Sequence, residues 1–328
     1  MIRSLYRSHD GQVRVDLKPD QLATALQDIN GTLWVDFVSE PSDVCEPILR
    51  ETFNFHPLAI EDALQESHSP KVDDWDDYLY LVLHAIASEK WGSGQLDTLE
   101  LDVFLGKNYV ITYHAQPIPI VDRVWGACQR DERHLSKGTD HLLYKLADEL
   151  AASYMPMIEE IDETIELLED QIFGQPTQAA LEQIFALKRL LLHLRRTITP
   201  QREVINKLAR DDYEVIDAED RVFFRDVYDH FTRLHYFIES TRDLVSGALE
   251  IYLSAVNNRM NEVMRTLAII TALFMPISFL TGFFGMNFFQ ATVPLDIWTS
   301  RPVFILAIGV MLLIPAGWYL WIRQRVWL

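Results

Sequence analysis

The sequence predicts an α+β domain followed by a very long helix and two membrane-spanning helices. Three observations support this fold class. Residues 1–135 alternate β-rich runs with short helical runs, residues 136–215 show the apolar spacing of helices, and the uncharged apolar runs 266–295 and 302–322 lie near the C-terminus. Each uncharged run is long enough to cross a bilayer, because a spanning helix needs roughly 20 apolar residues.

Residues 1–135 form the predicted α/β domain. Four runs that are rich in β-branched and aromatic residues and bounded by Gly, Asn or Asp are expected to be strands, at 32–38, 78–87, 99–106 and 108–114. Short helices between them are expected to begin at Ser42 or Asp43 and at Pro57.

Two antiparallel helices are expected within residues 136–215. The first covers 140–173 and is broken by Gly174 and Pro176, and the second follows with Pro200 kinking it rather than ending it. Both carry apolar residues at spacings of three and four, which is typical of amphipathic helices.

A third helical pattern begins near Asp220 and passes into the first apolar run, so residues 216–284 are expected to be one stalk helix that enters the membrane. If it is continuous, it is roughly 95 Å long. One such helix cannot cover its own apolar face, so we expect several copies of the chain to associate.

The arginines around the two spans predict their orientation. Arg259 and Arg265 precede the first span. Arg323 is the last residue of the second span, 301–323, and Arg325 lies in the tail 324–328. The loop 285–300 contains one charged residue, the acidic Asp296. By the positive-inside rule, both termini are expected in the cytosol, and the N-terminus has no apolar segment of signal-peptide length.

The charge and the short motifs exclude several classes of function. The net charge is −19, and the four arginines and one aspartate from Arg265 onward sum to +3, so the preceding residues carry −22. An acidic body of this kind argues against a nucleic-acid partner and attracts cations. Cys45 and Cys128 are expected to be free thiols. No enzyme motif is found, so neither an enzyme nor an organic cofactor is expected.

The first span carries a stripe of small, polar or flexible residues. A heptad register from Asn261 places these residues on one side: Asn261, Met264, Ala268, Thr271, Met275, Ser278 and Gly282. Two interpretations fit this pattern. The stripe either lets helices approach closely, or it lines a pore with polar and thioether side chains.

The segment 223–288 closely resembles the CorA family of magnesium channels. The family signature Gly-Met-Asn is matched by Gly285, Met286 and Asn287, and "RDVYDH", "DLVSG", "YLS", "NEVM" and "FMP" support the match. "HPLAIEDAL" and "PKVDDWDDYLYLVL" look like the cytosolic domain of the family. The resemblance implies a homopentameric funnel in the inner membrane that conducts Mg²⁺, with Co²⁺ and Ni²⁺ as further candidate ions.

The resemblance also implies roles for individual residues. Asn287 would form the outermost ring of the pore, whose wall below it would consist of Ser278, Met275, Thr271, Leu267, Met264 and Asn261. Leu267 takes the place that the heptad register gives to Ala268. Intracellular Mg²⁺ between subunits would inhibit the channel through Asp226, Glu89 and, secondarily, Asp229.

This sequence departs from the family at two places near the signature. Phe284 replaces the usual tyrosine, and the following loop lacks the usual glutamate and leaves Asp296 as its only acid. We expect Gly282 and Gly285 to permit a backbone turn that aims the Asn287 amide inward.

Two other functions compete with a magnesium channel. A zinc transporter of the ZntB type shares the fold, but Met286 favours the magnesium branch. A membrane-anchored coiled-coil scaffold explains the stalk and the acidic body, but it does not explain a polar stripe that ends in Gly-Met-Asn.

Overall fold

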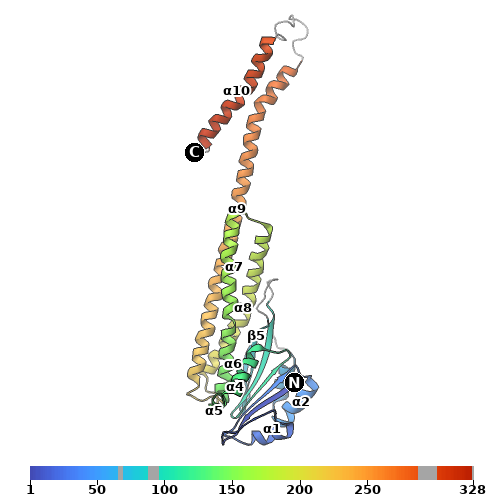
Figure 1. Cartoon of the computed structure of the whole chain (residues 1–328), viewed down its shortest axis with the longest axis vertical. Coiled ribbons are helices and arrows are strands. Elements are labelled where there is room, and N and C mark those ends of the chain that lie inside the picture. Colours follow the sequence, from blue (N-terminus) through green and yellow to red (C-terminus); the bar gives the residue numbers. More distant parts are fainter. Residues whose placement is uncertain (66–68, 88–95, 287–300, 327–328) are drawn as a thin grey trace. The chain divides into compact units, whose positions relative to one another are not determined.

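The expected α+β domain, long helix and terminal apolar helices are all present (Figure 1). The structure is a computed structural model, which describes residues 1–65, 69–87, 96–286 and 301–326. The chain divides into two compact units, Met1–Tyr252 and Leu253–Leu328.

A seven-stranded sheet forms the centre of the first unit. Its strand order is β2-β1-β3-β7-β6-β5-β4, and β3 and β7 pair in parallel while all other neighbours are antiparallel. The strands are β1 (Ile2–Arg7), β2 (Val13–Val15), β3 (Thr32–Val38), β4 (Lys71–Asp74), β5 (Tyr78–Ile86), β6 (Thr98–Gly106) and β7 (Tyr109–His114). The four predicted strands are confirmed as β3, β5, β6 and β7. Strands β1, β2 and β4 were not predicted, and β2 and β4 are short and lie at the two edges of the sheet.

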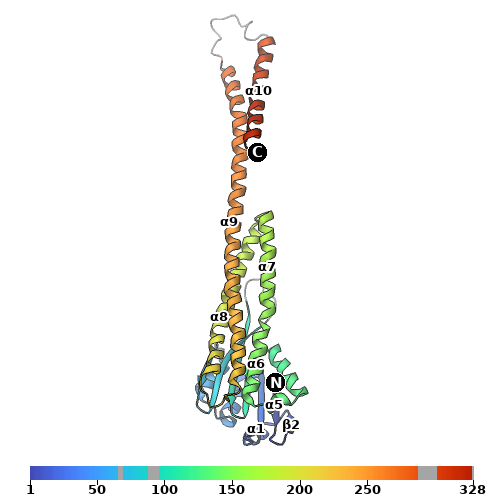
Figure 2. The same cartoon turned by 90° about the vertical axis from the view of Figure 1, so that its left-hand side faces the viewer.

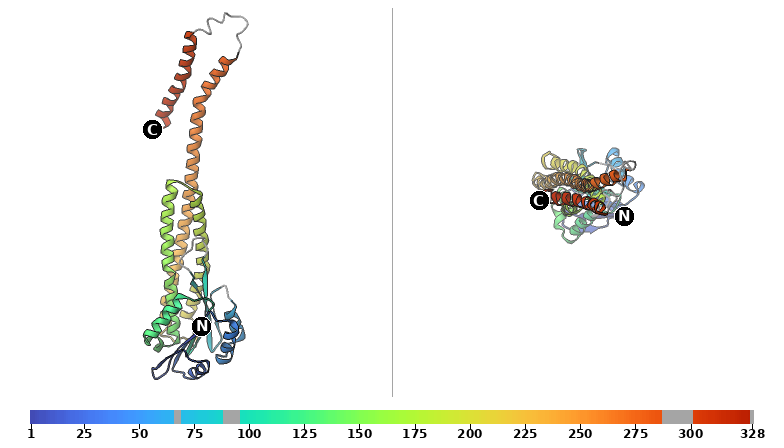
Figure 3. Two further views of the ribbon diagram at one scale, coloured as in Figure 1. Left: turned by 45° about the vertical axis from the view of Figure 1, so that its right-hand side comes forward. Right: turned by 90° about the horizontal axis from the view of Figure 1, so that it is seen from above.

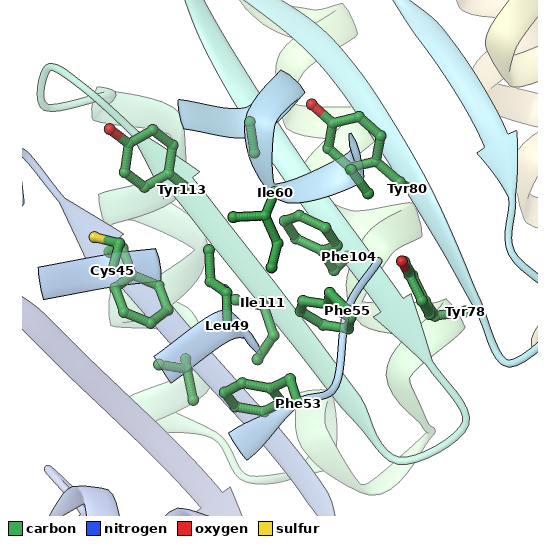
Figure 4. Close-up of a cluster of buried hydrophobic side chains, with 14 of the residues drawn as sticks. Cys45, Leu49, Phe53, Phe55, Ile60, Tyr78, Tyr80, Phe104, Ile111 and Tyr113 are labelled. Atoms are coloured by element: carbon green, nitrogen blue, oxygen red, sulfur yellow. The ribbon is translucent and has the colours of Figure 1, made fainter. Parts of the chain in front are cut away.

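One face of the sheet is covered by short helices and carries an aromatic core. These helices are α1 (Pro19–Leu26), α2 (Ser42–Pro47), η1 (Ile48–Thr52) and α3 (Pro57–Leu64). Phe55 stacks on Phe104 with ring centroids 4.2 Å apart, and Phe53 and Tyr78 lie beside it (Figure 4). Each such aromatic pair contributes about 0.5–1.5 kcal/mol beyond the burial of its area.

The other face carries α4 (Pro119–Arg130), α5 (Arg133–Ser136) and α6 (Thr139–Ser153). Here Trp34 of β3 packs on Trp125 of α4 with ring centroids 4.7 Å apart, and its indole N–H donates to Thr112 Oγ1 at 3.0 Å. The two faces together bury the β5 and β7 side chains almost completely, and those of β6 from Leu101 onward.

Three long helices continue from this face and lie side by side (Figures 1, 2 and 3): α7 (Met155–Gly174), α8 (Gln178–Arg210) and the first part of α9 (Arg221–Gly285). The single helix predicted over 140–173 is wrong, because the chain breaks between α6 and α7 at Tyr154. Pro156, in the first turn of α7, has no N–H to continue the hydrogen-bond ladder of α6. The structure shows α8 continuing through Pro200, as expected.

Helix α9 is continuous over 65 residues, as the sequence predicts. Its buried side chains recur every three or four residues and end at Tyr252: Phe224, Val227, Phe231, Leu234, Ile238, Thr241, Val245, Ala248 and Tyr252. No described side chain of α9 beyond Tyr252 is buried. The second unit contains this uncovered part of α9 and α10 (Arg301–Val326), and α9 and α10 each include a segment that is long and apolar enough to cross a membrane.

Candidate ion pathway and regulatory residues

The predicted pore residues lie along the uncovered part of α9. Met264, Leu267, Thr271 and Met275 line one groove of about 500 Å³. The other residues of the groove are Ala268, Ala272 and Pro276 of α9 and Trp318 of α10. Because Leu267 and Ala268 both line it, the heptad register and the family resemblance describe the same side of the helix.

Asn261 and Ser278 are exposed on α9 but lie outside this groove. Exposure is similar on and off the stripe, because Phe274 and Phe279, which lie off it, are 61% and 69% exposed and Met275 is 65% exposed.

Two residues that line this groove, Thr271 and Ala272, have an oxygen atom that can accept a further hydrogen bond. The Thr271 hydroxyl donates to the Leu267 carbonyl at 2.8 Å, so its hydrogen is used within the helix while its oxygen can still accept. Pro276 has no N–H, so the carbonyl of Ala272 lacks the donor that a helix normally supplies four residues later. Both oxygens can accept hydrogen bonds from water.

The end of α9 corrects one expectation. Gly282 lies inside the helix, which ends at Gly285, and neither glycine has a left-handed φ angle. The Met286 N–H donates to the carbonyls of Gly282 and Phe283 at 3.1 and 3.3 Å, so the helical turn is maintained up to that residue. The predicted backbone turn at Gly282 is therefore absent. Asn287, the loop 287–300 and the side chain of Phe284 lie outside the described residues.

The predicted regulatory residues Asp226 and Asp229 are exposed on α9, and Glu89 lies outside the described residues. Asp148 and Asp226 both act on Tyr144 of α6. The pKa of Tyr144 is raised first by burial and then by the charges of these two acids. His230 Nδ1 lies 3.3 Å from Asp148 Oδ1. The sequence analysis did not select Asp148, because nothing in the pattern of α6 distinguishes it from other acids.

In the part of the chain that the structure describes, no three His, Cys, Asp or Glu side chains are arranged to hold a metal ion. Asp226 and Asp229 therefore do not form a complete metal site within this part of one chain.

A second acidic feature was missed by the sequence analysis. A cavity of about 120 Å³ at the end of the sheet is lined by His84, Glu100 and Asp102, among others. Asp102 accepts a hydrogen bond from the Tyr80 hydroxyl at 2.6 Å, and burial raises its pKa well above the usual range. The alternation in "LELDVFLG" could have revealed it, because Glu100 and Asp102 share a strand face with the core residue Phe104.

The two cysteines are free, as expected, and both are buried. Burial raises the pKa of the Cys45 thiol to about 11 and that of Cys128 to about 12. Both thiols are therefore protonated near neutral pH, and neither is activated as a nucleophile.

Comparison with known proteins identifies close relatives. The chain is 33% identical over 294 residues to a putative metal ion transporter, YfjQ, of Bacillus subtilis, covering 90% of this chain and 89% of that protein. It is 34% identical over 305 residues to the cobalt/magnesium transport protein CorA of Thermotoga maritima, covering 92% and 85%. The solved structure of the CorA magnesium transporter of Methanocaldococcus jannaschii has the same fold, with a TM-score of 0.81 over 98% of this chain and 97% of that chain at 20% identity.

The family model described as "CorA-like Mg2+ transporter protein" matches residues 30–324, from just before β3 through most of α10. This match includes strands β3 to β7 of the sheet, the whole of α9 and the segment that carries Gly-Met-Asn. The chain therefore belongs to the CorA family of divalent-cation transporters.

Proposed function

We propose that five copies of this chain form a channel that admits Mg²⁺ to the cytosol, with Co²⁺ and Ni²⁺ as further permeating ions. The observation that carries this proposal is the single helix α9, which is buried on one side up to Tyr252 and then continues uncovered with the polar stripe. Polar side chains and an unpaired carbonyl are costly against lipid. A ring of five such helices would turn them toward a shared aqueous pathway.

The proposed selectivity follows from the hydration of the ion. Mg²⁺ is small, holds its water tightly and is dehydrated reluctantly. A ring of Asn287 side chains would present neutral carboxamide oxygens to the water shell of the ion rather than to the bare ion. Below that ring, the Thr271 hydroxyl and the Ala272 carbonyl offer further acceptors for the same shell. Neutral acceptors bind weakly enough to let the ion leave, whereas a ring of carboxylates would retain it.

The proposed location is the inner membrane with both termini in the cytosol, because the arginines flank the spans on that side. Cytosolic Mg²⁺ would close the channel by bridging acidic residues of neighbouring subunits, with Asp226 and Glu89 as ligands and Asp229 as a secondary one. The exposure of Asp226 supports this proposal, because an exposed carboxylate is accessible to a cation and to a neighbouring subunit.

The test is Mg²⁺ flux into liposomes that contain the purified protein. Cobalt hexammine, which imitates hydrated Mg²⁺, is expected to block the flux, and Asn287→Ala is expected to reduce both the flux and the block. Asn206→Ala, which removes an amide of α8, is the matched control and should conduct as the wild type does. An Asn287→Ala protein that conducts and is blocked normally would refute the Asn ring. Zn²⁺ uptake that exceeds Mg²⁺ uptake would favour a ZntB-type transporter.

A further inference from the structure

Strand β5 is longer than the strand that covers its outer edge. β4 pairs with β5 only from Asp74 opposite Leu79 to Lys71 opposite Val82. His84, two residues further on, lies opposite Glu100 of β6 on its other side. The backbone N–H and C=O of His84 both form hydrogen bonds to groups outside the sheet. This is the pattern of a non-hydrogen-bonded position in an antiparallel pair, where the backbone groups point away from the paired strand.

Two side chains from the helical layer take the place of the missing strand. The His84 N–H donates to Gln201 Oε1 at 2.8 Å, and the Tyr154 hydroxyl donates to the His84 carbonyl at 2.6 Å. Gln201 Nε2 donates to the Tyr154 hydroxyl at 3.0 Å and closes a ring of three hydrogen bonds. We call these three residues the edge ring.

The geometry of the edge ring fixes the roles of its members. The amide of Gln201 must present its oxygen to His84, since the opposite orientation would set two N–H donors against each other. Burial raises the pKa of Tyr154, so its hydroxyl keeps the proton that it donates. Gln201 and Tyr154 have no exposed surface, so removal of either leaves buried polar groups without partners.

Gln201 occupies a core position of α8. The buried residues around it on the same side of the helix are apolar: Leu194, Ile198, Ile205 and Leu208. A buried amide at such a position is unfavourable unless it is fully hydrogen-bonded. The edge ring satisfies both the amide oxygen and the amide nitrogen, which accounts for a glutamine among apolar residues.

Tyr154 also contacts the helix that enters the membrane. Its ring lies edge-on to Phe231 of α9 with centroids 6.4 Å apart, and Phe231 is fully buried. Phe231 is five residues from Asp226 on α9. His84 lies at the base of the β5–β6 hairpin, whose last described pairing is Ala87 N–H to the Asp97 carbonyl at 2.9 Å. Tyr154 thus contacts both the hairpin and α9.

We propose that Tyr154 and Gln201 are positioning residues that couple the β5–β6 hairpin to α9 and thereby set the cytosolic Mg²⁺ concentration that closes the channel. This inference rests on the proposed regulation by Mg²⁺. Loss of the edge ring would release the β5–β6 hairpin from α9. Mg²⁺ bound at the subunit interface would then act less strongly on α9. The concentration of Mg²⁺ needed for half-inhibition should then rise.

The variants for the test are Tyr154→Phe, Gln201→Leu and the double variant, all in the full chain reconstituted in liposomes. Tyr154→Phe keeps the aromatic contact with Phe231 and removes only the hydroxyl. The matched control is Tyr80→Phe, because Tyr80 is equally buried and its hydroxyl bonds to Asp102 within the sheet. Three quantities are measured: the half-inhibiting Mg²⁺ concentration on the cytosolic side, the melting temperature, and backbone hydrogen exchange at His84 and around Phe231.

Each single variant is expected to raise the half-inhibiting concentration about fivefold or more, the lower range of coupling between linked sites. The double variant should raise the half-inhibiting concentration little further than either single variant, because the two residues act as one unit. Exchange should quicken both at His84 and in α9 around Phe231. Tyr80→Phe should lower the melting temperature but leave half-inhibition within about twofold of the wild type.

A purely stabilising ring would give a different result. If Tyr154→Phe and Tyr80→Phe lower the melting temperature equally and neither shifts half-inhibition, the proposal is overturned. Faster exchange at His84 with unchanged exchange around Phe231 would also overturn it, and this result does not depend on transport. A wild-type channel that conducts but ignores cytosolic Mg²⁺ would instead refute the proposed regulation, and the coupling with it.

Discussion

The buried carboxylate of Asp36 should contribute far more to stability than the exposed carboxylate of Asp122, although both bind Arg3. Arg3 Nε donates to Asp36 Oδ2 at 2.7 Å, and an Arg3 terminal nitrogen lies 2.6 Å from Asp122 Oδ1. The Asp36 side chain has no exposed surface, whereas that of Asp122 is 54% exposed. The two acids thus differ mainly in burial.

Asp36 also has two further buried partners, which its removal would leave without an acceptor. The Thr112 hydroxyl donates to Asp36 Oδ1 at 2.6 Å, and His114 Nε2 lies 3.2 Å from the same oxygen. Breaking a buried ion pair by removing one partner costs about 3–5 kcal/mol, because the remaining groups lose both their partner and their access to water. An exposed ion pair contributes about 0–1 kcal/mol. We therefore expect Asp36→Ala to lower the free energy of unfolding by at least about 2 kcal/mol more than Asp122→Ala does.

The assay is a urea titration of the full chain in detergent. Near-UV circular dichroism would follow the packing of Trp34 on Trp125. Trp125 belongs to the surroundings of this network, because the Arg3 guanidinium lies 4.5 Å from the centroid of its ring. The slope of the transition should be the same in the two variants, so that midpoints can be compared. Equal midpoints for Asp36→Ala and Asp122→Ala would show that burial does not set the contribution of this pair.

Three further predictions concern regulation, thiol reactivity and pH. Asp226→Ala should weaken inhibition of flux by cytosolic Mg²⁺, while Asp243→Ala, an exposed acid further along α9, should not; equal inhibition in both would remove Asp226 from the sensor. Maleimide at pH 7.5 should label Cys45 and Cys128 only after denaturation, since burial raises both pKa values, and rapid labelling of the folded chain would contradict their burial. Burial lowers the pKa of His141 to about 4 from 6.5, so the folded chain binds fewer protons than the unfolded chain between these values. Stability from this group is present above pH 6.5 and is lost as the pH falls toward 4. His141→Phe should flatten that part of the urea midpoint–pH curve, and an unchanged curve would refute the assignment. The raised pKa values of Asp140 and Asp220 act in the opposite direction and are present in both proteins.

The sequence predicted those elements whose side-chain pattern is set by local burial. β3, β5, β6 and β7 are buried almost throughout, and their β-branched and aromatic residues mark them as strands. β4, with the sequence "KVDD", could not be recognised, because it is held by pairing with β5 rather than by its own apolar residues. Pro156 could have revealed the break between α6 and α7, since a proline is favoured in the first turn of a helix.

The candidate site was predictable only where it depends on one helix. The spacing of the stripe on α9 could be read from the sequence, and the groove of Met264, Leu267, Thr271 and Met275 has that spacing. The contact of His230 with Asp148 and the edge ring join elements far apart in the chain, so no local pattern contains them. One feature of the edge ring was visible in the sequence: Gln201 is an amide at a position of α8 where the spacing predicts an apolar residue.

The choice between Leu267 and Ala268 follows from the geometry of a straight helix. A helix of 3.6 residues per turn drifts about 20° per heptad from a strict seven-residue repeat. Over the two heptads from Asn261 to Met275 the drift is about 40°, nearly half of the 100° that separates successive residues. Adjacent residues then share one side, as Leu267 and Ala268 do in the groove. A five-fold ring of α9 helices would therefore present a leucine and an alanine at this level, and a small rotation of α9 would change which of them narrows the pathway.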